Sequence, residues 1–225
     1  MKLRTAVLPG LAAVALAAPA AAPAATLEVD KSCYAPGEKV AFSGGGFTPN
    51  GPVALSVGGQ QLGIGKANGV GEFAVSLGAP MIQGKERVDT FTATDQTNLS
   101  LTATTAVRLT SLKVTVKPRN GDPTKAKRIV ARGFTTGTTL YAHVRRGSSK
   151  RNVRIGKLKG ACKTLTAKRK LFPASAAEGV YKVQFDTRRT YAASTRPAVG
   201  FMFAVFHTFR PASASAVGEG WIRIG

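Results

Sequence analysis

A segment that occurs twice constrains the fold more than any other feature of this 225-residue chain. Residues 40–55 read VAFSGGGFTPNGPVAL, and residues 129–142 repeat them in degenerate form as IVARGFTTGTTLYA. In each copy a Phe-Thr pair leads, six residues after the Phe, into a run of alternating apolar residues. A repeat of about 85–90 residues is too long for a solenoid unit and suits one small β-sandwich. We therefore predict two related sandwiches in tandem.

Alternating apolar and polar residues predict strands throughout both halves, and beyond the N-terminal leader no stretch shows a helical period. Glycines at positions 44–46 in the first copy and at position 133 in the second are expected to turn the chain, because glycine tolerates positive φ. The expected fold class is all-β, with two tandem immunoglobulin-like β-sandwiches after a signal peptide. The expected segments are a signal peptide at 1–25, sandwiches at 26–110 and 111–210, and a loose tail at 211–225.

The N-terminus has the composition of a secretory signal peptide. Lys2 and Arg4 precede a short apolar stretch, and an Ala- and Pro-rich run with small-x-small cleavage sites follows. The apolar stretch is shorter than the roughly 20 residues that a membrane span requires. We therefore expect a secreted or extracellular protein, released or associated with the cell wall, whose mature chain has no membrane span.

The chain contains two cysteines, Cys33 and Cys162, and an even number in an exported chain permits a disulfide. One cysteine lies in each repeat, so a bond would join the two domains and close a loop of about 130 residues. Two separate thiols are the alternative, because the sequence does not tell whether the two Cα atoms come within about 7 Å of each other.

Charge is distributed very unevenly between the two halves. Residues 26–110 hold six basic and seven acidic side chains, whereas residues 111–210 hold 23 basic and three acidic ones. A domain with such an excess of one sign concentrates anions at its surface and repels like-charged partners. The alternative interpretation is a solvated basic surface that serves solubility alone.

The hairpin in the second repeat is longer than its counterpart and strongly basic. Nine steps separate Val144 from Val153, against five from Val57 to Leu62. The extra residues are largely cationic and form an expected basic finger, from which Arg154 also points outward. A second basic pair follows the strand at 180–185. The candidate polyanion-binding residues are Arg145, Arg146, Lys150, Arg151, Arg154, Arg188 and Arg189.

The run Glu178-Gly179-Val180-Tyr181 resembles the tyrosine corner of immunoglobulin-type sandwiches, in which a tyrosine hydroxyl caps nearby backbone. Val183 stands where antibody domains have a cysteine, and Phe91 is the counterpart of Tyr181 in the first repeat. Neither repeat has a cysteine pair of its own. The resemblance is to the bacterial Ig-like domains of exported proteins from high-GC bacteria, and it covers roughly residues 26–210.

Residues 37–74 also resemble the apoproteins of enediyne-carrying chromoproteins, which share the sandwich fold. That resemblance implies a small-ligand carrier with a cleft bounded by two disulfides within the domain. The two cysteines of this chain lie in different repeats and cannot form those bonds.

Residue clusters that define a reaction are missing from the sequence. His143 and His207 lie in different strands, and the alternation around His143 predicts that it faces solvent. No nucleophile elbow, zinc-binding His-Glu-x-x-His or Cys-x-x-Cys motif occurs. Asp89 and Asp95 flank one strand and are expected to be solvated strand-end residues, not calcium ligands. We expect no catalytic residues, no metal and no cofactor.

These features favour a secreted, non-catalytic binding or structural module whose basic second domain associates with an anionic polymer of the envelope or matrix. Arginine would contact phosphate or carboxylate groups in bidentate fashion. Nucleic acid is a less favoured partner, because Tyr141 and Tyr191 are the only aromatic residues near the basic clusters that could stack on bases. The same features are compatible with a small-ligand carrier and with a purely structural adhesin stalk.

Overall fold

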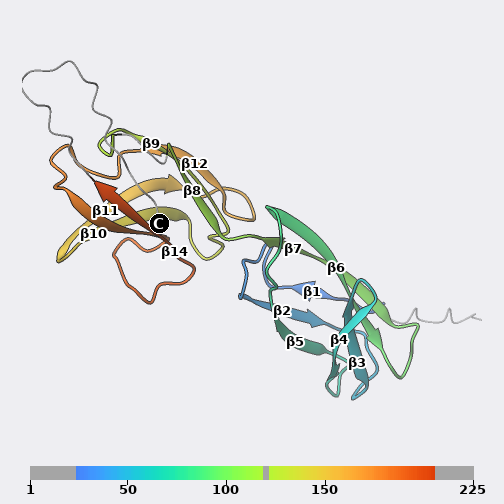
Figure 1. Cartoon of the computed structure of the whole chain (residues 1–225). Coiled ribbons are helices and arrows are strands. Elements are labelled where there is room, and N and C mark those ends of the chain that lie inside the picture. Colours follow the sequence, from blue (N-terminus) through green and yellow to red (C-terminus); the bar gives the residue numbers. More distant parts are fainter. Residues whose placement is uncertain (1–23, 119–121, 206–225) are drawn as a thin grey trace, which may run out of the picture.

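The computed structural model describes residues 24–118 and 122–205, and every regular element within them is a strand. The strands form two sandwiches joined end to end, so the molecule is elongated (Figure 1). Nearly all of the predicted signal peptide, the predicted tail and His207 lie outside the described residues.

The first sandwich consists of a three-stranded and a four-stranded antiparallel sheet. Their strand orders are β1-β2-β5 and β4-β3-β6-β7. The chain therefore crosses from one sheet to the other after the second strand and returns to the first sheet for the fifth. The strands are β1 (Glu28–Val29), β2 (Lys39–Gly44), β3 (Pro52–Val57), β4 (Gln60–Lys66), β5 (Phe73–Gly78), β6 (Glu86–Asp95) and β7 (Thr102–Thr110).

The second sandwich repeats this topology, with strand orders β12-β9-β8 and β11-β10-β13-β14. Strands one, two and five against strands four, three, six and seven is an arrangement of immunoglobulin-like sandwiches. The predicted fold class, two tandem immunoglobulin-like sandwiches, is confirmed. The strands are β8 (Lys113–Lys117), β9 (Lys127–Arg132), β10 (Thr139–Arg146), β11 (Ser149–Lys157), β12 (Leu165–Arg169), β13 (Gly179–Asp186) and β14 (Val199–Val205).

Each sandwich encloses a separate apolar core between its two sheets. In the first domain Phe42 of β2 packs on Phe91 of β6, with ring centroids 4.8 Å apart. In the second, Phe172 contacts both Tyr181 and Phe203 edge to face. Phe42 and Phe91 come from facing sheets, whereas Phe172 follows the end of β12 and packs on two side chains of one sheet, Tyr181 of β13 and Phe203 of β14.

Two glycines occupy equivalent positions in the repeat. Gly46 has φ of +80° and Gly133 has φ of +82°, a region that other residues rarely adopt. A Cβ atom on Gly133 would lie 2.7 Å from the carbonyl oxygen of Ser111. The prediction that glycines turn the chain here is confirmed, and the second turn also packs directly on the segment that leads into β8.

The tyrosine corner is present in the second domain. The hydroxyl of Tyr181 donates a hydrogen bond to the backbone carbonyl of Ala177 over 2.8 Å. In the first domain Phe91 is buried at the matching position and has no hydroxyl for such a bond. The feature on which the resemblance was based is thus present in one of the two copies.

Asp95 was predicted to be a solvated strand-end residue, and this prediction is wrong. Its side chain is fully buried and accepts backbone N–H hydrogen bonds from Thr48 at 2.6 Å, Thr97 at 2.7 Å and Asn98 at 3.0 Å. The carboxylate lies at the end of β6, where two loops converge and leave their N–H groups without strand partners. Burial alone would raise the pKa of Asp95, but these donors outweigh it and lower the pKa to about 2.

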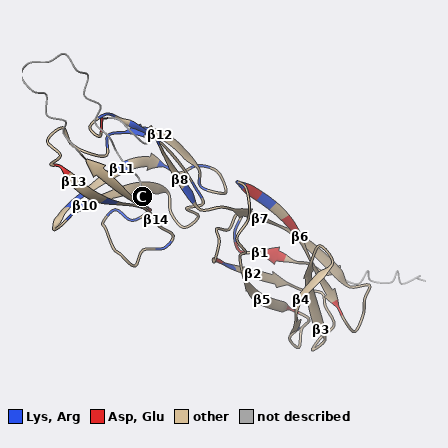
Figure 2. Cartoon of the chain, in the orientation of Figure 1, with Lys and Arg blue, Asp and Glu red and all other residues tan. Residues whose placement is uncertain are grey.

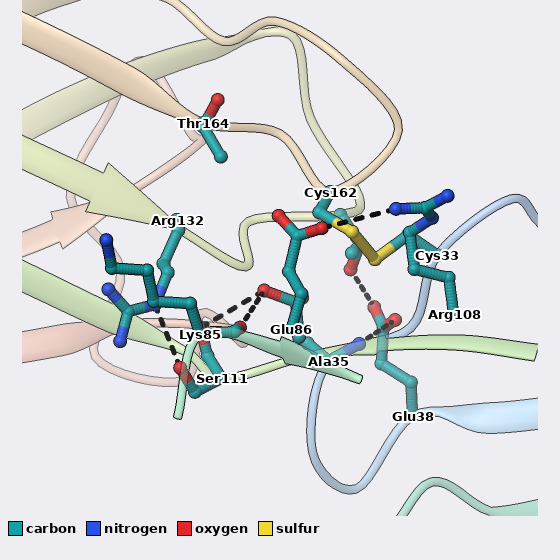
Figure 3. Close-up of a disulfide and its surroundings, with 12 residues drawn as sticks. Cys33, Ala35, Glu38, Lys85, Glu86, Arg108, Ser111, Arg132, Cys162 and Thr164 are labelled. Carbon is teal, nitrogen blue, oxygen red and sulfur yellow. Dashed lines mark hydrogen bonds and ion pairs between the residues drawn. A yellow bond between two sulfur atoms is a disulfide. The ribbon is translucent and has the colours of Figure 1, made fainter. Parts of the chain in front are cut away.

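Cys33 and Cys162 form a disulfide between the two domains, with Cα atoms 5.2 Å apart (Figure 3). Of the two states that the sequence left open, the structure has the bonded one. Both residues are almost fully buried. The bond therefore lies within the junction between the sandwiches.

Hydrogen bonds around the disulfide also cross the junction. The carboxylate of Glu38 accepts bonds from the Thr135 hydroxyl of the second domain and from the backbone N–H of Ala35 in the first. The hydroxyl of Ser111, between the domains, donates a hydrogen bond to the carbonyl of Gly84 and accepts one from Nε of Arg132. Both bonds are 2.8 Å long (Figure 3). The junction thus combines a covalent link with polar contacts on both sides of it.

Candidate polyanion-binding face

The basic finger is a paired β-hairpin up to its tip. β10 and β11 pair from Thr139 with Lys157 to Arg146 with Ser149, so only Gly147 and Ser148 form the turn. The extra residues of the second repeat therefore lengthen two strands and do not form an irregular loop. Because successive side chains of a strand point to opposite faces, this pairing divides the basic residues between two sides.

Three of the predicted finger residues share the surface that faces away from the core. Arg145 pairs with Lys150, and Tyr141 pairs with Arg154, so these side chains lie on one side of β10 and β11. On the neighbouring strand β13, Lys182 pairs with Arg145 and extends the same surface. We call this surface of β11, β10 and β13 the outer face.

The other two finger residues lie elsewhere. The guanidinium of Arg146 lies 5.9 Å from the ring centroid of Tyr181, which belongs to the core. Arg151 pairs with the core residue Val144 and is exposed near the tip of the hairpin. The structure therefore does not bring these two side chains to the outer face.

One residue of the second predicted cluster, Arg189, lies beside one residue of the first, Arg154. Arg189 and Arg154 line the same surface hollow of about 450 Å³, together with Tyr141, Asn152 and Thr190. We call it the Arg154 hollow. The side chain of Arg188 is exposed and is not among the residues that line this hollow. Sequence reasoning could not bring the two clusters together, because it gave no path for the chain after β13.

Residues 187–198 connect β13 to β14 and pass over the outer face. Tyr191 in this connection lies edge to face against His143, with ring centroids 5.9 Å apart, and its hydroxyl accepts a hydrogen bond from Arg145. A second hollow of about 400 Å³ lies between Tyr191 of this connection and strands β10, β13 and β14. Its lining includes Arg145, Lys182 and Tyr191. We call it the Arg145 hollow.

His143 was predicted to face solvent, and this prediction is wrong. It lies on the outer face, as the alternation requires, but the 187–198 connection covers it and leaves it 1% exposed. Its Nδ1 lies 2.7 Å from Oδ1 of Asn152, and its Nε2 lies 3.1 Å from Oδ1 of Asp186. Both ring nitrogens are therefore occupied, and the imidazole joins β10 to both neighbouring strands.

Asp186 is the acidic side chain of the outer face, and its oxygens are occupied by protein donors. Besides His143, it accepts bonds from the backbone N–H of Arg188 at 2.8 Å and from the side-chain amide of Gln184 at 2.6 Å. It is fully buried at the end of β13, the position that Asp95 occupies at the end of β6. Among the described residues, no carboxylate forms an ion pair with an Arg or Lys side chain of the outer face.

Basic residues predominate in the second domain, whereas the first carries both basic and acidic residues (Figure 2). The two domains also differ in how their charges are partnered. In the first domain Arg87 pairs with Asp89 at 2.8 Å, and Arg108 pairs with Glu86 at 3.4 Å. The second domain has too few acids for such pairing. Its basic side chains therefore project a positive field that internal ion pairs do not cancel.

Two further features are absent from the part of the chain that the structure describes. Within residues 24–118 and 122–205, no three His, Cys, Asp or Glu side chains lie close enough together to hold a metal ion. The same residues contain no helix with the length and apolar character needed to cross a bilayer.

No protein-family model matches the sequence, and neither does any curated protein. Among solved structures, one that matches is the human OSCAR ligand-binding domain, which is 12% identical with a TM-score of 0.33. The match covers 79% of this chain and 94% of that one. The strand order and the tyrosine corner, rather than this distant likeness, define the class: an all-β protein of two tandem immunoglobulin-like sandwiches.

Proposed function

We propose that the chain is an exported, non-enzymatic binding protein whose second domain binds anionic polymers through the outer face. The observation that carries this proposal is the Arg154 hollow. Arg154 and Arg189 are 35 positions apart in the sequence, yet they line one hollow that no described acidic side chain lines. A basic coat that served solubility alone would not require such convergence.

The spacing of charges on the outer face supports an extended ligand. Arg145 lies opposite Lys150 on one neighbouring strand and opposite Lys182 on the other. Paired strands are about 5 Å apart, so these like charges repel one another and attract a layer of counterions. A polymer with regularly spaced anions would displace those counterions, and their release would favour binding.

Phosphate-bearing wall polymers and acidic polysaccharides are the ligands that we favour. The planar guanidinium groups of Arg154 and Arg189 suit bidentate contact with phosphate or carboxylate. Nucleic acid is less favoured, since the guanidinium of Arg145 lies 4.3 Å from the ring centroid of Tyr191 and covers a ring face that a base would need.

The proposal includes export and an origin among bacterial Ig-like proteins of the cell envelope. The N-terminal leader has the composition of a signal peptide. The interdomain disulfide is consistent with that, because such bonds persist in oxidising compartments outside the cytosol. The protein would then act in the extracellular space or at the cell wall.

Polymer binding across a salt series tests the proposal. The probes are a poly(glycerol phosphate), an acidic polysaccharide and a single-stranded DNA of matched charge. The variant R154Q/R189Q removes two charges from the Arg154 hollow. The control K168Q/R169Q removes two charges from exposed positions of β12, in the other sheet of the same domain.

We expect R154Q/R189Q to weaken binding about 10-fold or more and to reduce the slope of log K against log salt by about 1–2. The control should change affinity by less than about 2-fold, since its cations lie off the outer face. Equal losses in both variants would refute a defined face. Failure of every polymer to bind would refute polymer binding and favour a structural stalk, and stronger binding of DNA would favour nucleic acid.

A further inference from the structure

The Arg145 hollow is separate from the Arg154 hollow and has a different chemistry. It lies between β13, β14 and the connection that carries Tyr191, and has a volume of about 400 Å³. That volume lies within the range of sites that hold one small molecule. We propose that it binds a small organic carboxylate, with Arg145 as the group that recognises the anion.

Arg145 is held in position by the protein but is not satisfied by it. One terminal nitrogen donates to the hydroxyl of Tyr191, and the guanidinium stacks on the ring of that tyrosine. The Nε atom of Arg145 is buried and has no hydrogen-bond partner. A buried donor without a partner is unfavourable by about 1–3 kcal/mol, so an oxygen acceptor that reached it would be bound favourably.

The polar groups around Arg145 favour a negatively charged ligand. Lys182 faces Arg145 across the β10–β13 pair, lines the same hollow and makes no ion pair among the described residues. The side-chain amide nitrogen of Gln184 already donates to Asp186 and to the carbonyl of Ala192. The charged groups of the lining that remain for a ligand are therefore two cations, which complement a carboxylate.

Apolar surface next to these cations favours an organic anion over an inorganic one. Met202 of β14 lines the hollow and is 47% exposed. Val180 lies two residues before Lys182 on the same side of β13 and is 59% exposed. A ligand whose carboxylate reaches Arg145 could cover this surface with its apolar part, and burial of that area would add to affinity.

The test is a titration of the full-length protein followed by NMR, including the Nε–H signal of Arg145. The probes are sodium benzoate, inorganic phosphate and benzyl alcohol, at a constant salt concentration of about 0.5 M that screens diffuse attraction. The variants are R145Q, R146Q and Y191F. R146Q is the matched control, because it removes the same charge at the adjacent position while its guanidinium lies by Tyr181, off the outer face.

We expect saturable binding of benzoate that shifts the Arg145 signal and that R145Q weakens at least about 10-fold. Y191F should weaken it less, R146Q should leave it unchanged, and phosphate and benzyl alcohol should bind more weakly. The proposal is overturned if benzoate does not saturate, if benzyl alcohol or phosphate binds equally well, or if R146Q weakens binding as much as R145Q.

The benzoate titration can be separated from the polymer test, although Arg145 and Lys182 lie on the outer face that both proposals use. R154Q/R189Q leaves Arg145, Lys182 and Tyr191 intact, so it should bind benzoate as the wild-type protein does. Loss of polymer binding with retained benzoate binding would identify two separate sites on one domain.

Discussion

Single buried carboxylates determine how loops are held at the ends of both sandwiches. Asp95 and Asp186 occupy equivalent positions at the ends of β6 and β13, and each accepts a backbone N–H from the residue two places on. Asp95 adds the N–H of Thr48, while Asp186 adds His143 on the outer face. The two carboxylates thus have the same structural role: Asp95 holds loops at one end of the first domain, and Asp186 holds residues of the candidate site in the second.

The low pKa of Asp95 predicts a specific loss of stability in acid. Its folded pKa of about 2 lies below the unfolded value near 3.9, so its stabilisation is complete above about pH 4 and is lost as the pH falls through 2. A difference of about two pKa units corresponds to roughly 2–3 kcal/mol. Asp95→Asn should therefore lower first-domain stability near pH 7 and flatten its pH dependence between 4 and 2.

Hydrogen exchange of the amides of β3 and β6 measures that effect. Asp89→Asn on the same strand is the control, because it removes a charge without removing an acceptor for the loop N–H groups. If Asp95→Asn retained the acid dependence of the wild type, the buried hydrogen bonds would not be its cause.

For the secondary-structure elements, the sequence predicted the strands well but predicted poorly where strands end, how the basic hairpin pairs and where the connection at 187–198 runs. Alternation predicted strands throughout both halves, and the strands of all four sheets lie there. β1 is only Glu28–Val29, and β12 ends at Arg169, before the buried Leu171 and Phe172. The basic hairpin was predicted, but not the extension of its pairing to Arg146. Strand pairing at the tip, which spacing alone does not determine, decides which of its cations share a face.

The connection at 187–198 is the element that the sequence could not place. It has no apolar period, and its path depends on tertiary contacts of Tyr191 with His143 and Arg145. It buries His143, brings Arg189 to Arg154 and contributes Tyr191 to the lining of the Arg145 hollow. The strand residues of the candidate site, such as Arg154, could thus be placed from the sequence. The position of Arg189 beside them could not, because it depends on the path of the connection.

At the scale of the whole molecule, the Cys33–Cys162 disulfide links two domains that each have a core. We expect C33S/C162S to keep both sandwiches folded while their relative orientation becomes variable, because Glu38, Thr135 and Ser111 supply only a few polar contacts. The chain-entropy model limits the lost stabilisation to about 4–5 kcal/mol for a loop of this length.

Small-angle scattering and separate NMR tumbling times for the two domains check this expectation. The variant should show a broader distribution of dimensions and shorter tumbling times, with strand amide shifts away from the junction unchanged. A scattering profile that matched the wild type would instead assign the rigidity to the noncovalent junction.

We propose that one face of the basic domain, and not its total charge, binds the polymer. NMR shift mapping of the full chain with a poly(glycerol phosphate) tests it most directly. We expect the perturbed amides to belong to β10, β11 and β13 and to residues 187–191. Perturbations spread equally over β8, β9 and β12, or centred on the first domain, would contradict it.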